Sequence, residues 1–187
     1  MTHMDNDVKQ VLFNAEELDS IATRLAQSIT NDYKGSTRKL LILSILKGSL
    51  IFTSDLMRKI DLPFELDFMK VSSYGSETVS KGPLKISLDL NREDISDLDI
   101  LVVEDIVDSG NTLSKLKQHL AERGAHSVKI CTLLDKPSRR VVPLEADYCG
   151  AQIPDEFVVG YGLDYDEKYR GLPYVGILKP EVYTKGE

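Results

Sequence analysis

The sequence contains no tryptophan, two cysteines and three histidines among its 187 residues. Two cysteines cannot form the disulfide framework of a small secreted protein, so we expect Cys131 and Cys149 to be reduced thiols in apolar surroundings. No apolar run approaches the roughly 18 residues that a membrane-spanning helix requires. The first residues are polar and acidic, without the basic and apolar regions of a signal peptide. These absences argue against a secreted or membrane protein and predict a cytoplasmic one.

The sequence is also poor in positive charge. It has 23 Lys and Arg residues against 30 Asp and Glu residues, which gives a formal net charge of -7. A protein that binds the nucleic-acid backbone usually carries a basic face, so we expect no nucleic-acid partner. With 12 Gly, 7 Pro and 42% apolar residues, the composition is that of an ordinary globular protein. The length predicts one domain over residues 1–187.

The apolar pattern predicts an α/β fold. After the candidate N-cap Asn14, apolar residues recur at helical spacing, and a second clear helix is expected between Gly110 and Arg123. Apolar or β-like runs predict strands near residues 40–46, 64–71, 85–90, 100–103 and 128–134. Because strands alternate with helices, we expect a mostly parallel twisted sheet flanked by helices.

The last part of the chain has a different pattern. From about Pro137 onward the β-like pieces are shorter and are separated by turns. We therefore expect a core of about residues 11–136 and a small C-terminal hood subdomain of about residues 137–187, to which the N-terminal segment contributes.

The most informative segment, residues 101–113, places three carboxylates and a small polar turn between a buried strand and a helix. In open α/β sheets the ligand crevice lies beyond the carboxyl ends of the strands. Backbone N–H groups of the turn can bind one anion at the helix N-terminus; its residues are Asp108, Ser109, Gly110, Asn111 and Thr112. Glu104 and Asp105 can accept hydrogen bonds from ribose hydroxyls or help hold Mg²⁺. An ordinary capped turn would explain Asp108 but not the two preceding acids, so we predict a ribose 5-phosphate site.

This segment resembles the phosphoribosyl-pyrophosphate signature of type I phosphoribosyltransferases, which has four hydrophobic residues, two acids and an Asp-Ser/Thr-Gly turn. Four further stretches resemble the hypoxanthine-guanine branch of that family, in its bacterial form: residues 46–49, 72–75, 134–140 and 153–165. The resemblance extends from about residue 11 to residue 180. It implies the type I phosphoribosyltransferase fold.

The resemblance also implies a pyrophosphate site with a metal ion. Lys47 and Gly48 would belong to the family's pyrophosphate loop, whose Leu46–Lys47 peptide is often cis and points backbone amides at the pyrophosphate. Arg170 would contact the leaving group. The implied cofactor is Mg²⁺, and its expected ligands are Glu104, Asp105 and Asp164.

A purine site is implied as well. Lys136 would donate to the 6-oxo oxygen of the base, Phe157 would stack on the ring, and Val158 would meet the base edge through its main chain, with Asp164 beside them. A lysine there would favour oxopurines, because it would oppose the exocyclic amino group of adenine. The long loop that closes over the reacting centre in the family would contain Ser73 and Tyr74.

The implied reaction transfers the 5-phosphoribosyl group from phosphoribosyl pyrophosphate to hypoxanthine or guanine, giving IMP or GMP plus pyrophosphate in purine salvage. Asp108 would act as the general base that exchanges a proton with purine N7. The resemblance further implies a homodimer or homotetramer and inhibition by guanosine tetraphosphate.

Other functions stay open at this point. The sequence does not rank hypoxanthine against guanine or xanthine, and the same sugar-phosphate site could serve a xanthine- or pyrimidine-specific phosphoribosyltransferase. A regulator that binds RNA on the same fold is a further alternative, against which the acidic net charge argues.

Overall fold

Strands and helices alternate along most of the chain. The structure, a computed structural model, describes residues 3–73 and 83–184. Its strands are β1 (Val8–Phe13), β2 (Lys39–Ile45), β3 (Glu65–Ser73), β4 (Leu84–Leu88), β5 (Leu98–Val107), β6 (Ser127–Asp135), β7 (Tyr148–Gln152), β8 (Val158–Val159) and β9 (Val175–Leu178). Its helices are α1 (Ala15–Tyr33), α2 (Leu50–Met57), α3 (Asn111–Glu122) and α4 (Pro180–Tyr183), together with the 3-10 helices η1 (His3–Asp7) and η2 (Pro137–Arg139).

The large sheet has the strand order β4-β3-β2-β5-β6-β7. Strands β3, β2, β5, β6 and β7 pair in parallel, and the edge strand β4 pairs antiparallel with β3. The expected mostly parallel α/β sheet is thereby confirmed. The chain moves from β2 to β3 on one side and from β5 to β6 on the other, so the strand order reverses between β2 and β5. The ligand crevice of such a sheet lies at this reversal, beyond the carboxyl ends of β2 and β5.

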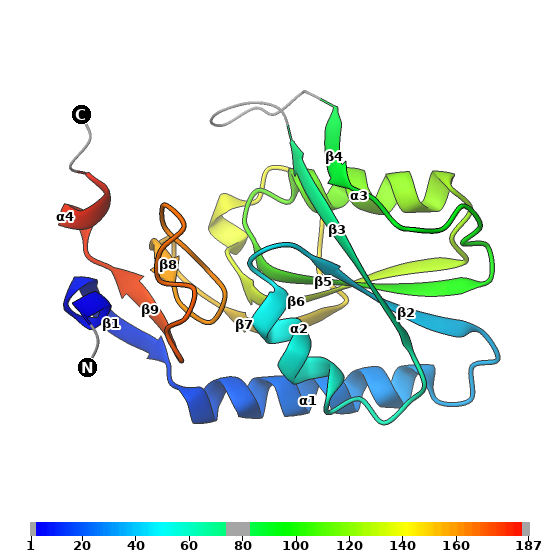
Figure 1. Ribbon diagram of the computed structural model, residues 1–187, viewed down its shortest axis with the longest axis horizontal. Helices are drawn as coiled ribbons and strands as arrows, with labels where there is room; N and C mark the ends of the chain where they lie inside the picture. The colour runs from blue at the N-terminus through cyan, green and yellow to red at the C-terminus, as the bar shows by residue number, and fades with distance from the viewer. Residues whose placement is uncertain (1–2, 74–82, 185–187) are drawn as a thin grey trace.

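Apolar side chains on both faces of the central strands explain their continuous hydrophobic runs. In β2, Leu40 and Ile42 face a cluster shared with α1 and α2, whereas Leu41 and Leu43 face a second cluster shared with α3. This division follows the two-residue period of a strand. Figure 1 shows α1 and α3 on opposite sides of the sheet. Helices on both faces make the core rigid where it supports the strand ends.

Helix α1 begins as its sequence predicts. The Asn14 side chain accepts a hydrogen bond from the backbone N–H of Glu17 at 3.0 Å, and the Glu17 carboxylate accepts one from the Asn14 N–H at 2.8 Å. This capping box satisfies two N–H groups that the helix itself leaves without partners. It fixes the point at which the chain turns from β1 onto the large sheet.

A second, smaller sheet has the strand order β1-β9-β8. It joins the start of the chain to its end, since β1 pairs antiparallel with β9, and Figure 1 shows these strands beside one end of the large sheet. The N-terminal contribution to the hood was expected, but β7 lies within the residues assigned to the hood and instead pairs in parallel with β6. The reason is that without β7 the strand β6 would end the sheet with unpaired N–H and C=O groups, which β7 satisfies.

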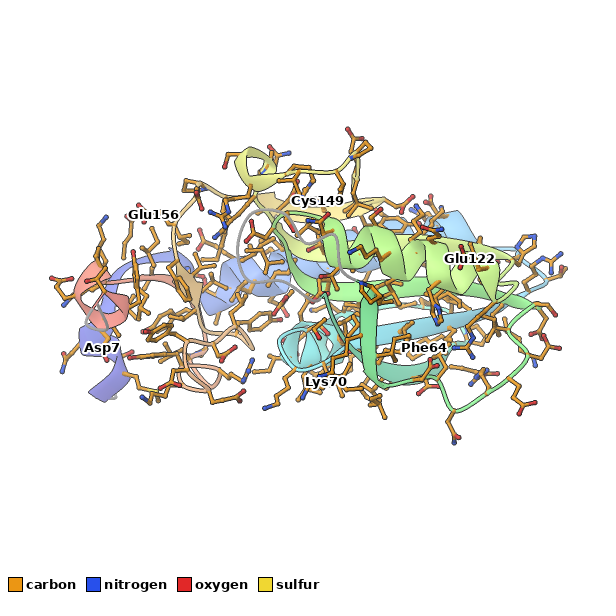
Figure 2. All side chains as sticks on the ribbon, turned by 90° about the horizontal axis from the view of Figure 1, so that it is seen from above. Asp7, Phe64, Lys70, Glu122, Cys149 and Glu156 are labelled. Atoms are coloured by element: carbon orange, nitrogen blue, oxygen red, sulfur yellow. The ribbon has the colours of Figure 1, made fainter. Side chains whose placement is uncertain are left out.

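The molecule is elongated along the direction that joins the two sheets. Figure 2 shows Asp7 and Glu156 at the small-sheet end, and Phe64 and Glu122 toward the other end. Within the described ranges, no helix combines the length and apolar character needed to cross a membrane. Both cysteines are free thiols; Cys131 is buried and Cys149 is half-buried.

Candidate active site

The turn after β5 surrounds a small cavity of about 200 Å³. Its lining includes Glu104, Asp108, Ser109, Gly110 and Thr112, all from the segment that the sequence singled out. Gly110 has a φ of 81°, a left-handed conformation that favours glycine, and immediately precedes α3. The first backbone N–H groups of α3 therefore lie beside this cavity, where an anion would also meet the positive end of the helix dipole. The Asn111 N–H donates to Ser109 Oγ at 3.4 Å, which helps to shape the turn.

Glu104 and Asp105 lie inside β5, which continues to Val107. The sequence suggested that the strand ends at these acids, but pairing with β6 extends it, because Ile106 and Val107 still find partners there. Burial and the neighbouring Asp105 charge raise the pKa of Glu104 well above its usual value, and burial also raises the pKa of Asp105. Two adjacent carboxylates that are costly to ionise form a site that a cation would stabilise.

The loop after β2 lies against the second of these acids. The Leu46–Lys47 peptide is cis. A Cβ added to Gly48 would lie 1.5 Å from Asp105 Oδ2, so the loop and the carboxylate can be this close only with glycine at this position. Two buried serines hold the loop in place: Ser49 Oγ donates to the Ile45 carbonyl at 2.6 Å and lies 2.9 Å from Ser44 Oγ.

A tight turn from the hood reaches the same loop. A Cβ on Gly162 would lie 2.1 Å from the Gly48 carbonyl oxygen, and Gly162 has a φ of 107°. Beyond it, Arg170 donates to the Gly162 carbonyl at 2.8 Å and pairs with Asp164 at 2.9 Å. Arg170 is also close enough to Asp105 to oppose the rise in that carboxyl group's pKa. The hood thus brings a cation to the carboxyl ends of β2 and β5.

Glu167 joins the cations of the two segments. Its Oε2 lies 2.8 Å from Lys47 Nζ and 3.4 Å from Arg170 Nη2. Glu167 was not among the predicted site residues, because its partner Lys47 lies 120 residues earlier in the sequence. Lys47 and Arg170, which the resemblance assigned to one pyrophosphate site, are thereby brought together.

The end of β6 supplies a further group of charges. The Lys136 side chain is almost buried, and its Nζ lies 3.9 Å from Asp155 Oδ1. Arg139 Nε donates to Asp108 Oδ1 at 3.0 Å, and Arg139 also pairs with Asp155 at 3.7 Å. Arg140 donates to the Asp108 carbonyl oxygen and pairs with Asp135. These contacts connect Lys136 to the turn after β5. The two arginines were not among the predicted site residues.

Phe157 and Val158 come next along the chain, at the edge of the hood. Val158 is buried in β8, whereas the Phe157 side chain is 38% exposed and can present part of its ring to a ligand. Tyr183 stacks on Phe157 with ring centroids 5.2 Å apart, and Tyr165 meets it edge-on at 5.4 Å. Neither tyrosine was predicted; both hold the Phe157 ring in a defined orientation.

One expectation has a different outcome, and a second falls partly outside the described residues. Within residues 3–73 and 83–184, no three His, Cys, Asp or Glu side chains lie close enough together to hold a metal ion. Asp164 is instead paired with Arg170 at 2.9 Å. The three carboxylates expected to share Mg²⁺ are therefore not gathered at one point. Ser73 is the last residue of β3, and Tyr74 lies outside the described residues.

The site as a whole consists of a turn that can bind an anion, two acids, the cations Lys47 and Arg170, and a nearly buried lysine. They lie at the carboxyl ends of the strands of the large sheet. These groups come from segments far apart in the sequence: the loop after β2, the turn after β5, the end of β6 and the hood. Such a set can bind a phosphorylated sugar, stabilise a second anionic group nearby and recognise a carbonyl oxygen.

Comparison with known proteins gives consistent results. A family profile described as the phosphoribosyl transferase domain matches residues 9–166. The chain is 49% identical to a hypoxanthine-guanine phosphoribosyltransferase of Staphylococcus aureus, over 97% of this chain and 99% of that protein. It is 51% identical to the bifunctional protein TilS/HprT of Listeria monocytogenes, again over 97% of this chain but over 28% of that protein. The chain thus spans little more than a quarter of the length of this longer relative.

Solved structures agree in fold. A crystal structure of a hypoxanthine phosphoribosyltransferase from S. aureus superposes with a TM-score of 0.92 at 49% identity, covering 97% of both chains. A point mutant of the Trypanosoma cruzi hypoxanthine phosphoribosyltransferase, described as a ternary substrates complex, superposes with a TM-score of 0.88 at 40% identity. It covers 95% of this chain and 99% of that one.

Proposed function

Because the chain belongs to the phosphoribosyltransferase family, we propose that it transfers the 5-phosphoribosyl group of phosphoribosyl pyrophosphate to hypoxanthine or guanine. The products are IMP or GMP and pyrophosphate, and the role is purine salvage. The expected family and its α/β fold are confirmed by relatives that match nearly the whole chain.

One observation carries the proposal. The loop after β2, the turn after β5 and the hood meet at the point where the strand order of the large sheet reverses. The turn suits the 5-phosphate, the acids suit the ribose hydroxyls, and the Lys47–Arg170 pair suits the departing pyrophosphate. These preorganised cations would stabilise the negative charge that builds on the leaving group. Such electrostatic stabilisation is usually the largest single contribution to rate acceleration.

Base recognition is assigned to Lys136, Val158 and Phe157. The Lys136 ammonium can donate to the 6-oxo oxygen, and the buried setting makes an unpaired donor costly, so adenine is disfavoured. The half-exposed Phe157 ring, supported by Tyr183, can stack on a purine. Val158 lies in β8 next to it, where its main chain can meet the base edge.

A magnesium ion fits the two acids of β5. Mg²⁺ is usually held in proteins by one or two carboxylates together with substrate oxygens and water, so Glu104 and Asp105 suffice as protein ligands. Their raised pKa values mean that each is costly to ionise without a nearby cation. When bound, the ion neutralises charge on the sugar diphosphate.

Asp108 is assigned as the general base. It follows β5 directly, lines the phosphate cavity and is 45% exposed, so it can approach a base placed above the sugar. A carboxylate there can exchange a proton with purine N7 while N9 forms the new bond to ribose C1.

The test is nucleotide formation from phosphoribosyl pyrophosphate and Mg²⁺ with hypoxanthine, guanine, xanthine, adenine and uracil offered separately. We expect product from the 6-oxopurines and none from adenine. Product from uracil alone would move the function to pyrimidines. No product with any base, together with specific RNA binding, would support the regulatory alternative.

Oligomeric state and regulation stay predictions. By similarity to the family, we expect a homodimer or homotetramer and competitive inhibition by guanosine tetraphosphate. Light scattering measures the first, and a competition experiment against phosphoribosyl pyrophosphate measures the second.

A further inference from the structure

Glu167 has no part in the assignments above, yet it touches both cations of the pyrophosphate site. We propose that its carboxylate is an internal substitute for pyrophosphate: it neutralises Lys47 and Arg170 in the ligand-free enzyme and leaves them when pyrophosphate binds. The inference rests on the proposed function, because it takes these two cations as pyrophosphate ligands.

A single oxygen of Glu167 carries both contacts. Oε2 lies 2.8 Å from Lys47 Nζ and 3.4 Å from Arg170 Nη2. One anionic oxygen between an ammonium and a guanidinium is also the arrangement that a phosphate oxygen adopts between the same groups. The carboxylate therefore makes with these two cations the contacts that a phosphate oxygen can make.

The hood turn holds Arg170 in place without this contact. Arg170 pairs with Asp164 Oδ1 at 2.9 Å and donates to the Gly162 carbonyl at 2.8 Å. The Glu167 backbone N–H is in turn fixed by Asp164 Oδ2 at 2.9 Å. Release of the Glu167 side chain would thus leave both the turn and the arginine where they are.

The Glu167 side chain is free to move away. It is 66% exposed, so it can rotate into solvent without uncovering apolar surface. Pyrophosphate and a carboxylate cannot share the two cations at close range, because like charges repel. Exposed ion pairs are weak individually, so Glu167 should reduce pyrophosphate affinity only severalfold, which assists product release without blocking substrate.

The experiment compares two neighbouring carboxylates. Asp166 is 73% exposed, precedes Glu167 directly and pairs with Lys168 at 3.1 Å. Asp166→Asn removes the same charge from the same turn. It therefore measures the effect of losing one negative charge near the site without losing the contacts with Lys47 and Arg170. Calorimetric titration of the full chain with pyrophosphate and Mg²⁺ measures the dissociation constant. We expect Glu167→Gln to bind about three- to tenfold more tightly than wild type, and Asp166→Asn to stay within about twofold.

A second variant guards against an effect of the new amide. Glu167 has a φ of 60°, which glycine adopts easily, so Glu167→Gly should also tighten pyrophosphate binding. Equal affinity of the Glu167 and Asp166 variants, or weaker binding after loss of Glu167, would overturn the inference.

Nucleotide formation by the wild-type chain separates this inference from the proposed function. If the wild type makes IMP but the variants bind pyrophosphate equally, only the inference is wrong. If the wild type neither makes nucleotide nor binds pyrophosphate, the proposed function is wrong, and the inference with it.

Discussion

Asp108 lines the cavity of the turn after β5 and also contacts the two arginines that follow β6. Its carboxylate accepts a hydrogen bond from Arg139 at 3.0 Å, and its carbonyl oxygen accepts one from Arg140. Arg140 thereby holds the main chain of the turn after β5, and Arg139 orients the Asp108 side chain. A residue held in this way can transfer a proton without changing the shape of the phosphate cavity.

Replacement of Asp108 by asparagine should separate catalysis from binding. Asparagine keeps the size of the side chain but cannot accept the proton, so we expect kcat to fall by about 10²- to 10⁴-fold. The dissociation constant of phosphoribosyl pyrophosphate should change by less than roughly threefold, because the turn binds it mainly through backbone groups. Steady-state kinetics and calorimetry measure the two quantities.

Asp155→Asn is the matched control. Asp155 pairs with Arg139 at 3.7 Å and lies 3.9 Å from Lys136, so the variant removes a carboxylate from the same group of charges without removing the assigned base. Its kcat should stay within about tenfold of wild type, since a misplaced supporting group costs less than the base itself. A parallel loss of turnover and binding in Asp108→Asn would contradict the assignment of the general base.

Among the secondary-structure elements, the strands of the large sheet carry different kinds of residues at their two ends. The carboxyl ends carry the site, and the amino ends are joined by a polar network around Asp99 of β5. Asp99 is almost buried and accepts hydrogen bonds from Ser127 at 2.5 Å and from Ser36 at 3.4 Å. His126 Nδ1 lies 2.9 Å from the same carboxylate. Ser36 precedes β2 and Ser127 begins β6, so one carboxylate joins three neighbouring strands.

This network predicts a pH-dependent stability. Burial alone would raise the pKa of Asp99, but hydrogen bonds from Ser127 and His126 outweigh it, and the pKa lies below its usual value of 3.8. A carboxyl group with a depressed folded-state pKa stabilises the fold fully above its unfolded pKa, and this contribution is lost as the pH falls through the folded pKa. Asp99→Asn should therefore lower the free energy of unfolding by about 1–3 kcal/mol at pH 7, and by less below about pH 4.

Urea unfolding at several pH values checks this prediction. The control is Asp97→Asn, because Asp97 is 58% exposed and pairs with Lys39 at 3.3 Å on the surface. That variant should cost less than about 1 kcal/mol at pH 7. A difference between Asp99→Asn and wild type that stays constant down to about pH 2 would show that the charge of Asp99 does not matter.

On the scale of the whole molecule, the site is complete only where the hood meets the core. The contact between Gly162 of the hood and the Gly48 carbonyl oxygen leaves no room for a side chain on Gly162, and Asp105 leaves none on Gly48. Asp105 lies against Gly48, and Arg170 of the hood is close enough to oppose the rise in the pKa of that carboxyl group, so the hood and the acids meet around this loop. A change at this contact should act on stability and on catalysis together.

We predict that Gly162→Ala destabilises the protein by about 2–4 kcal/mol and sharply reduces turnover. The new Cβ would lie 2.1 Å from the backbone oxygen of Gly48, which cannot rotate away as a side chain could, and φ is 107°. Gly35→Ala is the control, because Gly35 has a φ of 85° but nothing within 4 Å of its added Cβ. That variant should cost only the roughly 1–2 kcal/mol of backbone strain and keep full activity.

Thermal unfolding and steady-state kinetics measure both effects. If the two glycine variants lose the same stability and activity, backbone strain alone explains both losses. The contact between Gly162 and Gly48 then has no separate role.

Features that depend on neighbouring residues can be predicted from the order of side chains. The phosphate turn at Asp108 and Gly110, the acids before it and the capping box at Asn14 are each formed within a few residues, so their chemistry is visible in the order of side chains. The two-faced burial of β2 was likewise predictable from its uninterrupted apolar run.

Which distant segments meet becomes visible in the folded chain. The pairing of β1 with β9, the position of β7 in the large sheet and the contact of Lys47 with Glu167, 120 residues later, have no local signal. Edge strands accept any segment that satisfies their hydrogen bonds, and charged side chains pair with whichever partner the fold brings near. The physical reason is that such contacts are selected by packing of the whole chain, while turns and caps are selected by the residues that form them.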